Sequence, residues 1–520
     1  MKRFLAIIIL LCQILAGCSG EALEAKDEKP SIPKLEEPFF PLGWYASLVR
    51  EDLKGISDQG GNFAITYVLT GRLKKEQLSD YLDEAERKSI KVLLDITADW
   101  KWFDDDMPIP SDPVGSWMWT RELAFSKKAS HFGPWTSGKN EHGFVLRENG
   151  YPILNVQDHD VIEQWVYIPK DSNVKEIMME FYAAKDDNIF SWAHRVYWGE
   201  DLVEREWKEK KLDAFRAGDL PKERNQWVKL IFNANDIDLD ATVVKGVDFV
   251  NFGSQVYWDL FTRRTGKERI EERVKYLWEK PALYGWYLCD EPELRNIDPK
   301  RLRELYDIVR AADPNPNHII APVFQDMKIV DAYSDSCDVI FLDCYPVTCN
   351  SRKMDWMTTW VAEGMRIAKK QNKRFVFVPQ GFGDCPEYPL WTKPTAHELH
   401  WMTWTPIIMG ARGICYWAYY KATPEIIKES GVMFGEIKKY QDYLEKGTPV
   451  TGLSCNITSD SDNDNVPDVV YSVLEYEGKR LVLISNVTSK KFDNVRLSGP
   501  SFNVKTKMGA YDIFIGEYDF

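Results

Sequence analysis

Short apolar runs alternate with amphipathic stretches along most of this chain. Apolar runs of four to eight residues bounded by turn residues predict strands, and apolar residues at every third or fourth position predict helices. The two kinds of segment alternate from Phe39 to Ile96 and again from Lys267 to Trp417. Strands that alternate with helices in this way are typical of a parallel sheet with helices packed outside it.

The number of strands indicates how that sheet is closed. An open doubly wound sheet is expected to carry a Gly-rich phosphate turn after its first strand, and this chain has none. Eight strand–helix units instead predict an α/β protein of the (β/α)8 TIM-barrel class. The predicted strands are 39–46, 62–68, 91–96, 282–289, 318–323, 338–343, 374–380 and 413–417.

About 160 residues interrupt the barrel pattern after its third strand. The second half of this insertion contains short strand-like runs at 161–168, 176–183, 227–232 and 247–252, which predict an antiparallel β-sandwich. Because the insertion leaves the rim of strand three, we expect it to lengthen any binding surface there. Segments 218–221, 226–230, 249–252 and 256–259 resemble jelly-roll modules of bacterial carbohydrate-active proteins. The resemblance implies that Trp192, Trp198, Tyr257 and Trp258 stack on a glycan; the alternative is that these rings fill the sandwich core.

The helical pattern ends after Gly447, where a predicted hairpin at 469–476 and 480–486 opens a small C-terminal β domain. An acidic loop precedes this hairpin, with Asp460, Asp462, Asp464 and Asp468 near one another in sequence. The loop resembles those of calcium-binding repeats, which implies a structural calcium ion, although the Gly and the distal Glu of an EF-hand are missing. The alternative is a solvated acidic loop. No other cofactor is indicated.

The N-terminus has the pattern of an export signal, with Lys2 and Arg3 before an apolar run. Residues 15–18, Leu-Ala-Gly-Cys, resemble the bacterial lipobox. This resemblance implies cleavage before Cys18, lipidation of its thiol, and anchoring in the cell envelope, with the outer membrane favoured; a plain secretory signal is the alternative. The predicted parts are therefore signal peptide 1–17, tether 18–37, barrel 38–100 and 264–446, sandwich 101–263, and C-terminal β domain 447–520.

The composition of the chain limits which classes of ligand it can bind. A net charge of −14 argues against a nucleic-acid ligand, which requires a basic surface. Twenty Trp, 24 Tyr and 25 Phe provide rings that could stack on sugars as well as fill a core. The sequence does not indicate a protein partner.

The segment 282–293 carries the strongest chemical signal, because a buried strand ends there in Asp290-Glu291-Pro292. Pro292 cannot donate to a sheet ladder, so the strand ends at about that residue. This places carboxylates at the C-terminal rim of the barrel, where TIM-barrel enzymes have their active sites.

These strand ends resemble the clan-A glycoside hydrolases. The resemblance is carried by 284–292 on strand four, 343–346 on strand six and 413–417 on strand eight, and it implies that Glu291 is the acid/base residue. Asp290 replaces the Asn usual in that family, and alternation along the strand predicts that it points away from Glu291. Asp290 is nevertheless expected to raise the pKa of Glu291 through like-charge repulsion.

The second carboxylate departs from the family pattern. Clan A has a nucleophilic Glu at the end of strand seven, where this chain has Gln380, and an amide cannot form the ester intermediate. Asp343, Asp95, Asp384 and Glu387 are the alternatives. A spacing of about 5 Å from Glu291 would suit retention, and about 6.5–9.5 Å would suit inversion.

Aromatic residues at other strand ends complete the predicted sugar cleft. We expect Asp290, Gln380 and the aromatic residues Trp44, Trp286, Tyr345 and Trp417 to contact the substrate. Two functions fit this pattern. One is a cell-envelope glycoside hydrolase that acts on a polysaccharide or oligosaccharide, with Glu291 and Asp343 catalytic. The other is a glycan-binding lipoprotein whose barrel has lost activity.

Overall fold

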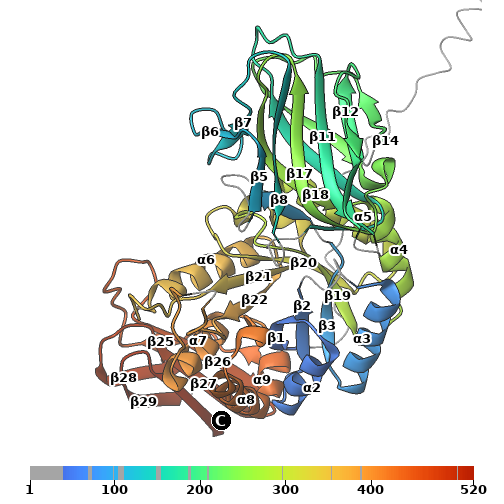
Figure 1. Cartoon of the computed structure of the whole chain (residues 1–520). Coiled ribbons are helices and arrows are strands. Elements are labelled where there is room, and N and C mark those ends of the chain that lie inside the picture. The colour runs from blue at the N-terminus through green and yellow to red at the C-terminus, as the bar shows by residue number, and fades with distance from the viewer. Residues whose placement is uncertain are drawn as a thin grey trace, which may run out of the picture. The chain divides into compact units, whose positions relative to one another are not determined.

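Eight parallel strands close into a barrel in the computed structural model, confirming the TIM-barrel class (Figure 1). The structure describes residues 39–519 except 68–72, 98, 104–110, 148–153, 186–188, 208–209, 296, 353, 387–388 and 501. Strand order around the barrel follows the order in the chain, and the last strand pairs with the first through Leu42 and Ile414. The barrel strands are β1 (Leu42–Ser47), β2 (Phe63–Thr66), β3 (Lys91–Asp95), β19 (Leu283–Asp290), β20 (Ile319–Phe324), β21 (Val339–Cys344), β22 (Arg374–Pro379) and β23 (Ile414–Tyr416).

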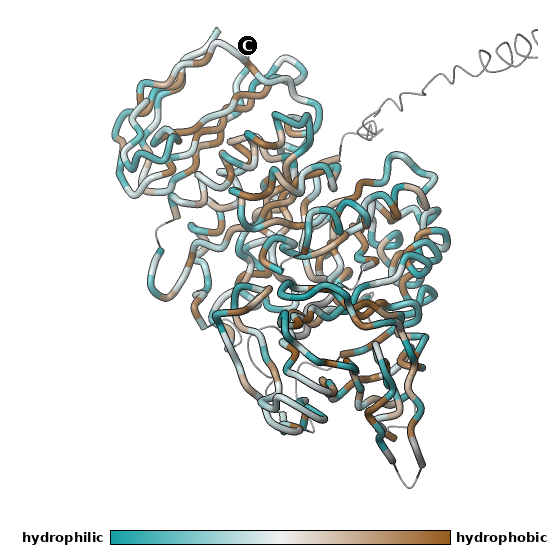
Figure 2. Tube along the Cα trace, turned by 90° about the horizontal axis from the view of Figure 1, so that it is seen from above, coloured by the Kyte–Doolittle hydropathy of each residue, from teal (hydrophilic) through white to brown (hydrophobic). Residues whose placement is uncertain are grey.

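Amphipathic helices cover the outside of this barrel. Figure 2 shows hydrophilic and hydrophobic segments alternating along the chain, including the helical coils. Within the described residues, two short 3-10 turns, Val330–Ala332 and Ser334–Ser336, take the place of a helix between β20 and β21. The helices are α2 (Arg50–Asp58), α3 (Lys75–Arg87), α4 (Lys267–Leu277), α5 (Pro299–Ala312), α6 (Trp356–Lys370), α7 (Ala396–Met409), α8 (Pro424–Lys439) and α9 (Gln441–Lys446).

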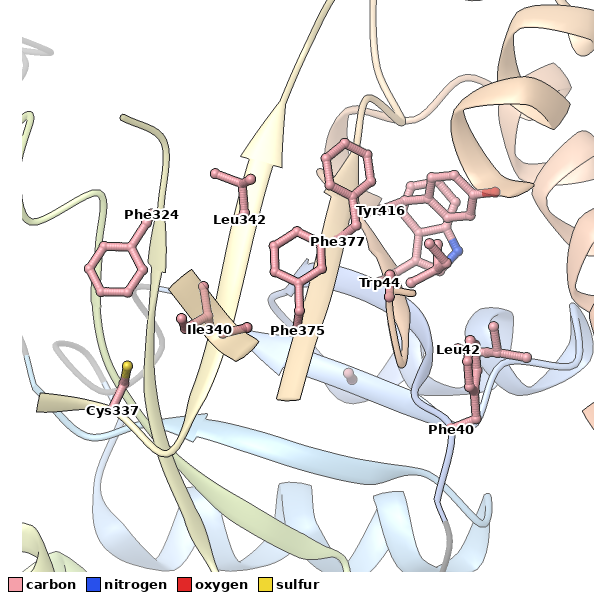
Figure 3. Packing of buried hydrophobic residues seen from close by; sticks show 14 of the residues in the cluster. Phe40, Leu42, Trp44, Phe324, Cys337, Ile340, Leu342, Phe375, Phe377 and Tyr416 are labelled. Atoms are coloured by element: carbon pink, nitrogen blue, oxygen red, sulfur yellow. The ribbon is translucent and has the colours of Figure 1, made fainter. Parts of the chain in front are cut away.

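Alternation along each strand sorts the barrel core into two layers. On β21, for example, Phe341 and Val339 face the barrel interior, whereas Ile340 and Leu342 pack against the surrounding helices. Figure 3 shows part of the outer layer, where Leu342, Phe375 and Phe377 lie together. Which layer a residue joins therefore decides whether it can reach the mouth of the barrel.

The insertion after β3 is the predicted β-sandwich. Its two main sheets consist mostly of antiparallel strands. One sheet has the order β16-β10-β18-β7-β6, with β4 also on β18, and the other has the order β15-β12-β11-β17-β8-β5, with β9 also on β17. The strands are β4 (Trp100–Phe103), β5 (Ser111–Gly115), β6 (Met118–Thr120), β7 (Ser130–Phe132), β8 (Lys139–Leu146), β9 (Leu154–Val156), β10 (Asp160–Tyr167), β11 (Glu176–Ala184), β12 (Ser191–Gly199), β13 (Glu206–Trp207), β14 (Lys210–Lys211), β15 (Phe215–Gly218), β16 (Trp227–Asn233), β17 (Thr242–Phe252) and β18 (Tyr257–Thr265).

The aromatic residues of the sandwich divide between core and surface. Trp198 and Trp258 belong to its hydrophobic core, so the core interpretation holds for these two rings. Trp192 is 7% exposed, and the guanidinium of Arg205 lies over its ring, 5.2 Å from the ring centroid. Tyr257 is only half-buried and packs against Phe132.

Two small antiparallel sheets form the C-terminal β domain and include the predicted hairpin. The strands are β24 (Thr448–Pro449), β25 (Ser454–Cys455), β26 (Val469–Tyr476), β27 (Lys479–Asn486), β28 (Phe492–Gly499), β29 (Phe502–Met508) and β30 (Ile513–Asp519). The predicted signal peptide, Cys18 and the tether to residue 37 lie outside the described residues. Among the residues that are described, no helix is both long and apolar enough to cross a membrane.

Candidate functional site

Glu291 occupies a constrained backbone position at the C-terminal end of β19. Its amide donates to the carbonyl of Val323 on β20 at 2.8 Å, which fixes the chain where the strand ends. Its φ of 42° lies in the left-handed region, which non-glycine residues rarely adopt. Such strained residues cluster at functional sites, where the surrounding structure maintains them. The backbone therefore supports Glu291 as the centre of the candidate site.

The protonated carboxyl of Asp343, at the end of β21, donates a hydrogen bond to the side chain of Glu291. Asp343 is 2% exposed, and the hydroxyl of Tyr345 donates to its Oδ2 at 2.6 Å. No N–H or O–H of the described residues reaches its buried Oδ1. A hydrogen bond between two carboxyl groups requires a proton on one of them. The pair therefore holds a proton inside the barrel mouth.

Burial and like charge keep that proton bound at neutral pH. Burial, followed by the negative charge of Asp290, raises the pKa of Glu291 to about 7, and Arg295 partly opposes this rise. The pKa of Asp343 is raised well above its usual range, first by burial and then by the neighbouring Glu291. A carboxylic acid that remains protonated near pH 7 has the property required of a general acid.

Asp290 lies at the same mouth, contrary to the prediction that it points away from Glu291. The register of β19 against β20 shifts between Tyr287 and Asp290, and this shift disrupts simple alternation. The hydroxyls of Tyr45 and Tyr287 donate to Asp290 Oδ1, and Arg295 donates to its Oδ2 and, at 2.6 Å, to its backbone oxygen. Asp290 is therefore held by protein groups beside the carboxyl pair.

Sequence reasoning missed the groups that hold Asp290. Arg295 also donates to the hydroxyl of Tyr67 at 3.3 Å, so one guanidinium joins the ends of β2 and β19. Two signals in the sequence point to these residues: Arg295 follows Glu291 by four positions, and Tyr45 alternates with Trp44 on strand one. Either signal becomes decisive only once the inward face of each strand is known.

Three of the predicted substrate-binding residues are buried away from the cleft, so these predictions are wrong. Trp44 and Trp286 are fully buried in the outer core layer, where their indole nitrogens donate to Gln59 and Asp313, respectively. Figure 3 shows Trp44 beside Tyr416 in this layer.

Gln380 is also fully buried. Its Oε1 accepts from the amide of Val347 at 2.9 Å, and its Nε2 donates to the carbonyls of Val347, Phe382 and Thr392 at 3.0–3.1 Å. This amide therefore cross-links loops beneath the rim and has no free polar atom for a sugar.

Trp417 and Tyr345, the other two predicted aromatic contacts, both face the mouth. Trp417 is 8% exposed and packs against Tyr45 and Tyr67 with centroid distances of 4.6 and 5.2 Å. Tyr345 is half-buried and packs on Phe382. Both belong to the inward-facing cluster of the barrel, so they are placed where a bound ligand could contact their edges.

The remaining candidate carboxylates lie in different surroundings. Asp95 ends β3, is 6% exposed, and accepts from the amide of Thr97. Asp384 accepts from the amide of Lys393 at 3.2 Å in an exposed loop. Glu387 lies outside the described residues.

The acidic loop brings together three of its four predicted metal ligands. Carboxylate oxygens of Asp460, Asp462 and Asp464 lie within 4.8 Å of one another. Asp468 differs, because it is buried and accepts hydrogen bonds from Ser459 and Ser461. An oxygen-rich cluster is the donor set that calcium requires. The geometry therefore fits a cation at the first three residues and gives Asp468 a role in shaping the loop.

Comparisons with known proteins show only distant likenesses. No protein-family model matches the chain, and no curated protein matches it. Among solved structures, the α-amylase from Geobacillus thermoleovorans complexed with acarbose shares 9% identity over 93% of this chain and 94% of its own, with a TM-score of 0.38.

Two further solved structures show the same limited likeness. AmyP in complex with maltose shares 9% identity over 48% of this chain and 67% of its own, with a TM-score of 0.32. The xylan-binding domain CBM22-1 of Paenibacillus barcinonensis Xyn10C shares 13% identity over 32% of this chain and 92% of its own, with a TM-score of 0.20. Likenesses this distant carry no argument for a shared substrate, so function is argued from the site itself.

Proposed function

We propose that the chain is a glycoside hydrolase acting on a polysaccharide or oligosaccharide, with Glu291 as proton donor. The carrying observation is the hydrogen-bonded pair of Glu291 and Asp343 at the barrel mouth, where the pKa of Glu291 is raised to about 7. Cleavage of a glycosidic bond requires a protonated group beside the leaving oxygen and stabilisation of the positive charge that develops on the sugar. Glu291 supplies the first, and the nearby carboxylate of Asp290 supplies part of the second.

Asp343 acts in this proposal as a positioning residue. Two carboxyl groups in hydrogen-bonding contact leave no room between them for an anomeric carbon, whereas retaining pairs stand about 5 Å apart and inverting pairs about 6.5–9.5 Å apart. Asp343 instead orients the Glu291 carboxyl through a hydrogen bond, which lowers the pKa of Glu291, while burial and the charge of Asp290 keep that pKa high. Because Gln380 is buried and fully bonded, the end of β22 supplies no nucleophile, and in this proposal the anomeric carbon is attacked by a water molecule from solvent or by a substituent of the sugar itself.

Reducing-end release from a panel of polysaccharides tests the proposal. Glu291→Gln should bind glycan normally while turnover falls by about 100-fold or more, the usual scale for general acid catalysis. Asp343→Asn keeps a neutral hydrogen-bonding partner for Glu291, so the alkaline limb of the pH–rate profile should stay in place, whereas Asp343→Ala removes the hydrogen bond that lowers the pKa of Glu291 and should move that limb to higher pH. Activity that survives Glu291→Gln unchanged would remove Glu291 from the mechanism.

One observation favours a second function, binding of a glycan without cleavage. The position at the end of β22, where the resembled family has its nucleophile, holds the buried amide of Gln380. A non-catalytic barrel would bind the same glycans with equal affinity in wild type and in Glu291→Gln, and would release no reducing ends in either. The stereochemistry of the released sugar, followed by NMR, would decide between inversion and retention if cleavage is seen.

The location of the protein is part of the same proposal. We propose that Cys18 is lipidated and anchors the chain to the bacterial cell envelope, on the support of residues 15–18 alone. Cys18→Ala should then move the protein out of the membrane fraction or leave its signal uncleaved. Wild-type protein that is wholly soluble and takes up no labelled acyl chain would contradict this anchoring.

A further inference from the structure

A cavity of about 280 Å³ lies where one sheet of the inserted sandwich meets the loop after β19 and the start of α5. Trp165 on β10, Lys229 on β16 and Arg264 on β18 line it from the sandwich, and Arg295 and Lys300 line it from the barrel. Ligand pockets in proteins usually measure about 300–1,000 Å³, so this cavity lies at the small end of that range and suits a single sugar unit.

Arg295 connects this cavity to the candidate active site. It lines the cavity and also donates to Asp290, which lies beside Glu291. The Nε and Nη2 of Arg295 are engaged by Asp290 and Tyr67, and no acceptor among the described residues contacts its Nη1. A glycan whose scissile bond lies at Glu291 would thus have a neighbouring unit within reach of this guanidinium.

The cavity lining has a net positive charge, whereas the whole chain has a net negative charge. Its lining has six cationic and four acidic residues, whereas the protein carries a net charge of −14. Arg301 is fully occupied, because its guanidinium donates to Asp99, Glu304 and the carbonyl of Thr265. Arg264 is different: only its Nε contacts a carboxylate, that of Glu163 at 2.9 Å, and its side chain is 21% exposed. Among the described residues no acceptor contacts its two terminal nitrogens, which can therefore bind a ligand.

An aromatic wall completes the lining. The rings of Phe125 and Trp165 stack with centroids 3.8 Å apart, and the ammonium of Lys229 lies 5.8 Å from the Trp165 ring. Phe125 is 37% exposed. Rings of this kind cover the apolar face of a sugar, and guanidinium groups bind planar carboxylates through paired hydrogen bonds.

We propose that this cavity binds the carboxylate of a uronic acid unit, with Arg264 and Arg295 holding the carboxylate and the aromatic wall contacting the sugar ring. The inference rests on the proposed function, which places the scissile bond of the glycan at Glu291. It adds the chemical class of the substrate. It also gives the inserted sandwich a direct part in recognition, because Arg264, Lys229 and both aromatic residues come from that module.

Binding to matched pairs of oligosaccharides tests the assignment without depending on cleavage. Each pair consists of a uronate-containing oligosaccharide and the same compound with its carboxyl groups chemically reduced to alcohols, with sulfated and desulfated pairs in parallel. In the Glu291→Gln background, which prevents turnover, we expect at least one acidic member to bind more tightly than its reduced partner. Arg264→Gln should weaken binding of that acidic member by about 10- to 100-fold, the cost of one charge-assisted contact, and leave the reduced partner unaffected.

Two variants control for folding and for charge alone. Arg264→Lys retains the positive charge but loses the planar guanidinium that donates paired hydrogen bonds, so it should retain only part of the affinity. Arg216→Gln removes an exposed cation that pairs with Asp219 on the sandwich and should change nothing. No preference for any acidic member, a preference that Arg264→Gln leaves intact, or a preference confined to sulfated sugars would overturn the uronate assignment. Absence of hydrolysis, with the carboxylate preference still dependent on Arg264, would refute the proposed activity and leave this binding site standing.

Discussion

The raised pKa of Glu291 should make the stability of the protein depend on pH, and this dependence can be measured without a substrate. In the unfolded chain the carboxyl has its ordinary pKa of 4.5, and in the folded protein its pKa is about 7. The difference corresponds to about 3 kcal/mol. Because the folded-state pKa is the higher one, this contribution to stability is fully present below pH 4.5 and is lost as the pH rises to about 7. Above pH 7 the folded state bears the whole cost of the buried charge.

Glu291→Gln removes the titrating group and keeps the size of the side chain. We therefore compare the free energy of unfolding of the variant with that of wild type at two pH values. The variant's value minus the wild-type value should be about 3 kcal/mol larger at about pH 8.5 than at about pH 4. Urea unfolding followed by tryptophan fluorescence at several pH values provides the comparison. Glu86→Gln on the exposed face of α3 is a matched control and should show no such change. A difference between Glu291→Gln and wild type that is the same at both pH values would refute the buried, proton-holding pair.

Three other predictions address the rest of the site and the acidic loop. Gln380→Ala should lower the free energy of unfolding by about 2–4 kcal/mol in denaturation experiments, because several buried backbone groups lose their partner at once. Gln380→Glu should place a carboxylate against three carbonyls and destabilise the protein without creating a nucleophile. Tyr345→Phe removes the hydrogen bond to Asp343 Oδ2 and should raise the pKa of that carboxyl further, which would be visible as an alkaline shift in an NMR titration. Calcium titration calorimetry should show binding that Asp462→Asn weakens by about 10-fold or more, whereas Asp468→Asn should retain binding but lower the melting temperature, since its carboxylate bonds Ser459 and Ser461.

The architecture could be predicted because the barrel repeats one simple pattern. Each strand carries a nearly continuous apolar run, and a helix, two short 3-10 turns or the insertion separates it from the next, so local periodicity was sufficient to identify the strands and their order. The end of β19 was also identifiable, since Pro292 stops the ladder directly after two carboxylates.

The identity of the inward-facing residues was not predictable in the same way. Trp44 and Tyr45 are neighbours of similar size, and only the closure of the barrel shows that Trp44 packs outward and Tyr45 inward. Asp290 was misplaced because a register shift in β19 changes the face on which the last residues point. Gln380 was misassigned because its hydrogen-bonding partners come from loops far apart in sequence.

The position of the insertion has a consequence for how the chain comes to be folded. β3 pairs directly with β19, and all of the sandwich lies between them in the sequence. When the first three barrel strands leave the ribosome, the fourth has yet to be made, so β3 has an open edge until the whole module has been synthesised. The module also begins and ends on neighbouring strands, because β4 pairs with β18. Early pairing of those two strands would bring β3 and β19 together, so that assembly of the sandwich sets the moment at which the two parts of the barrel can join.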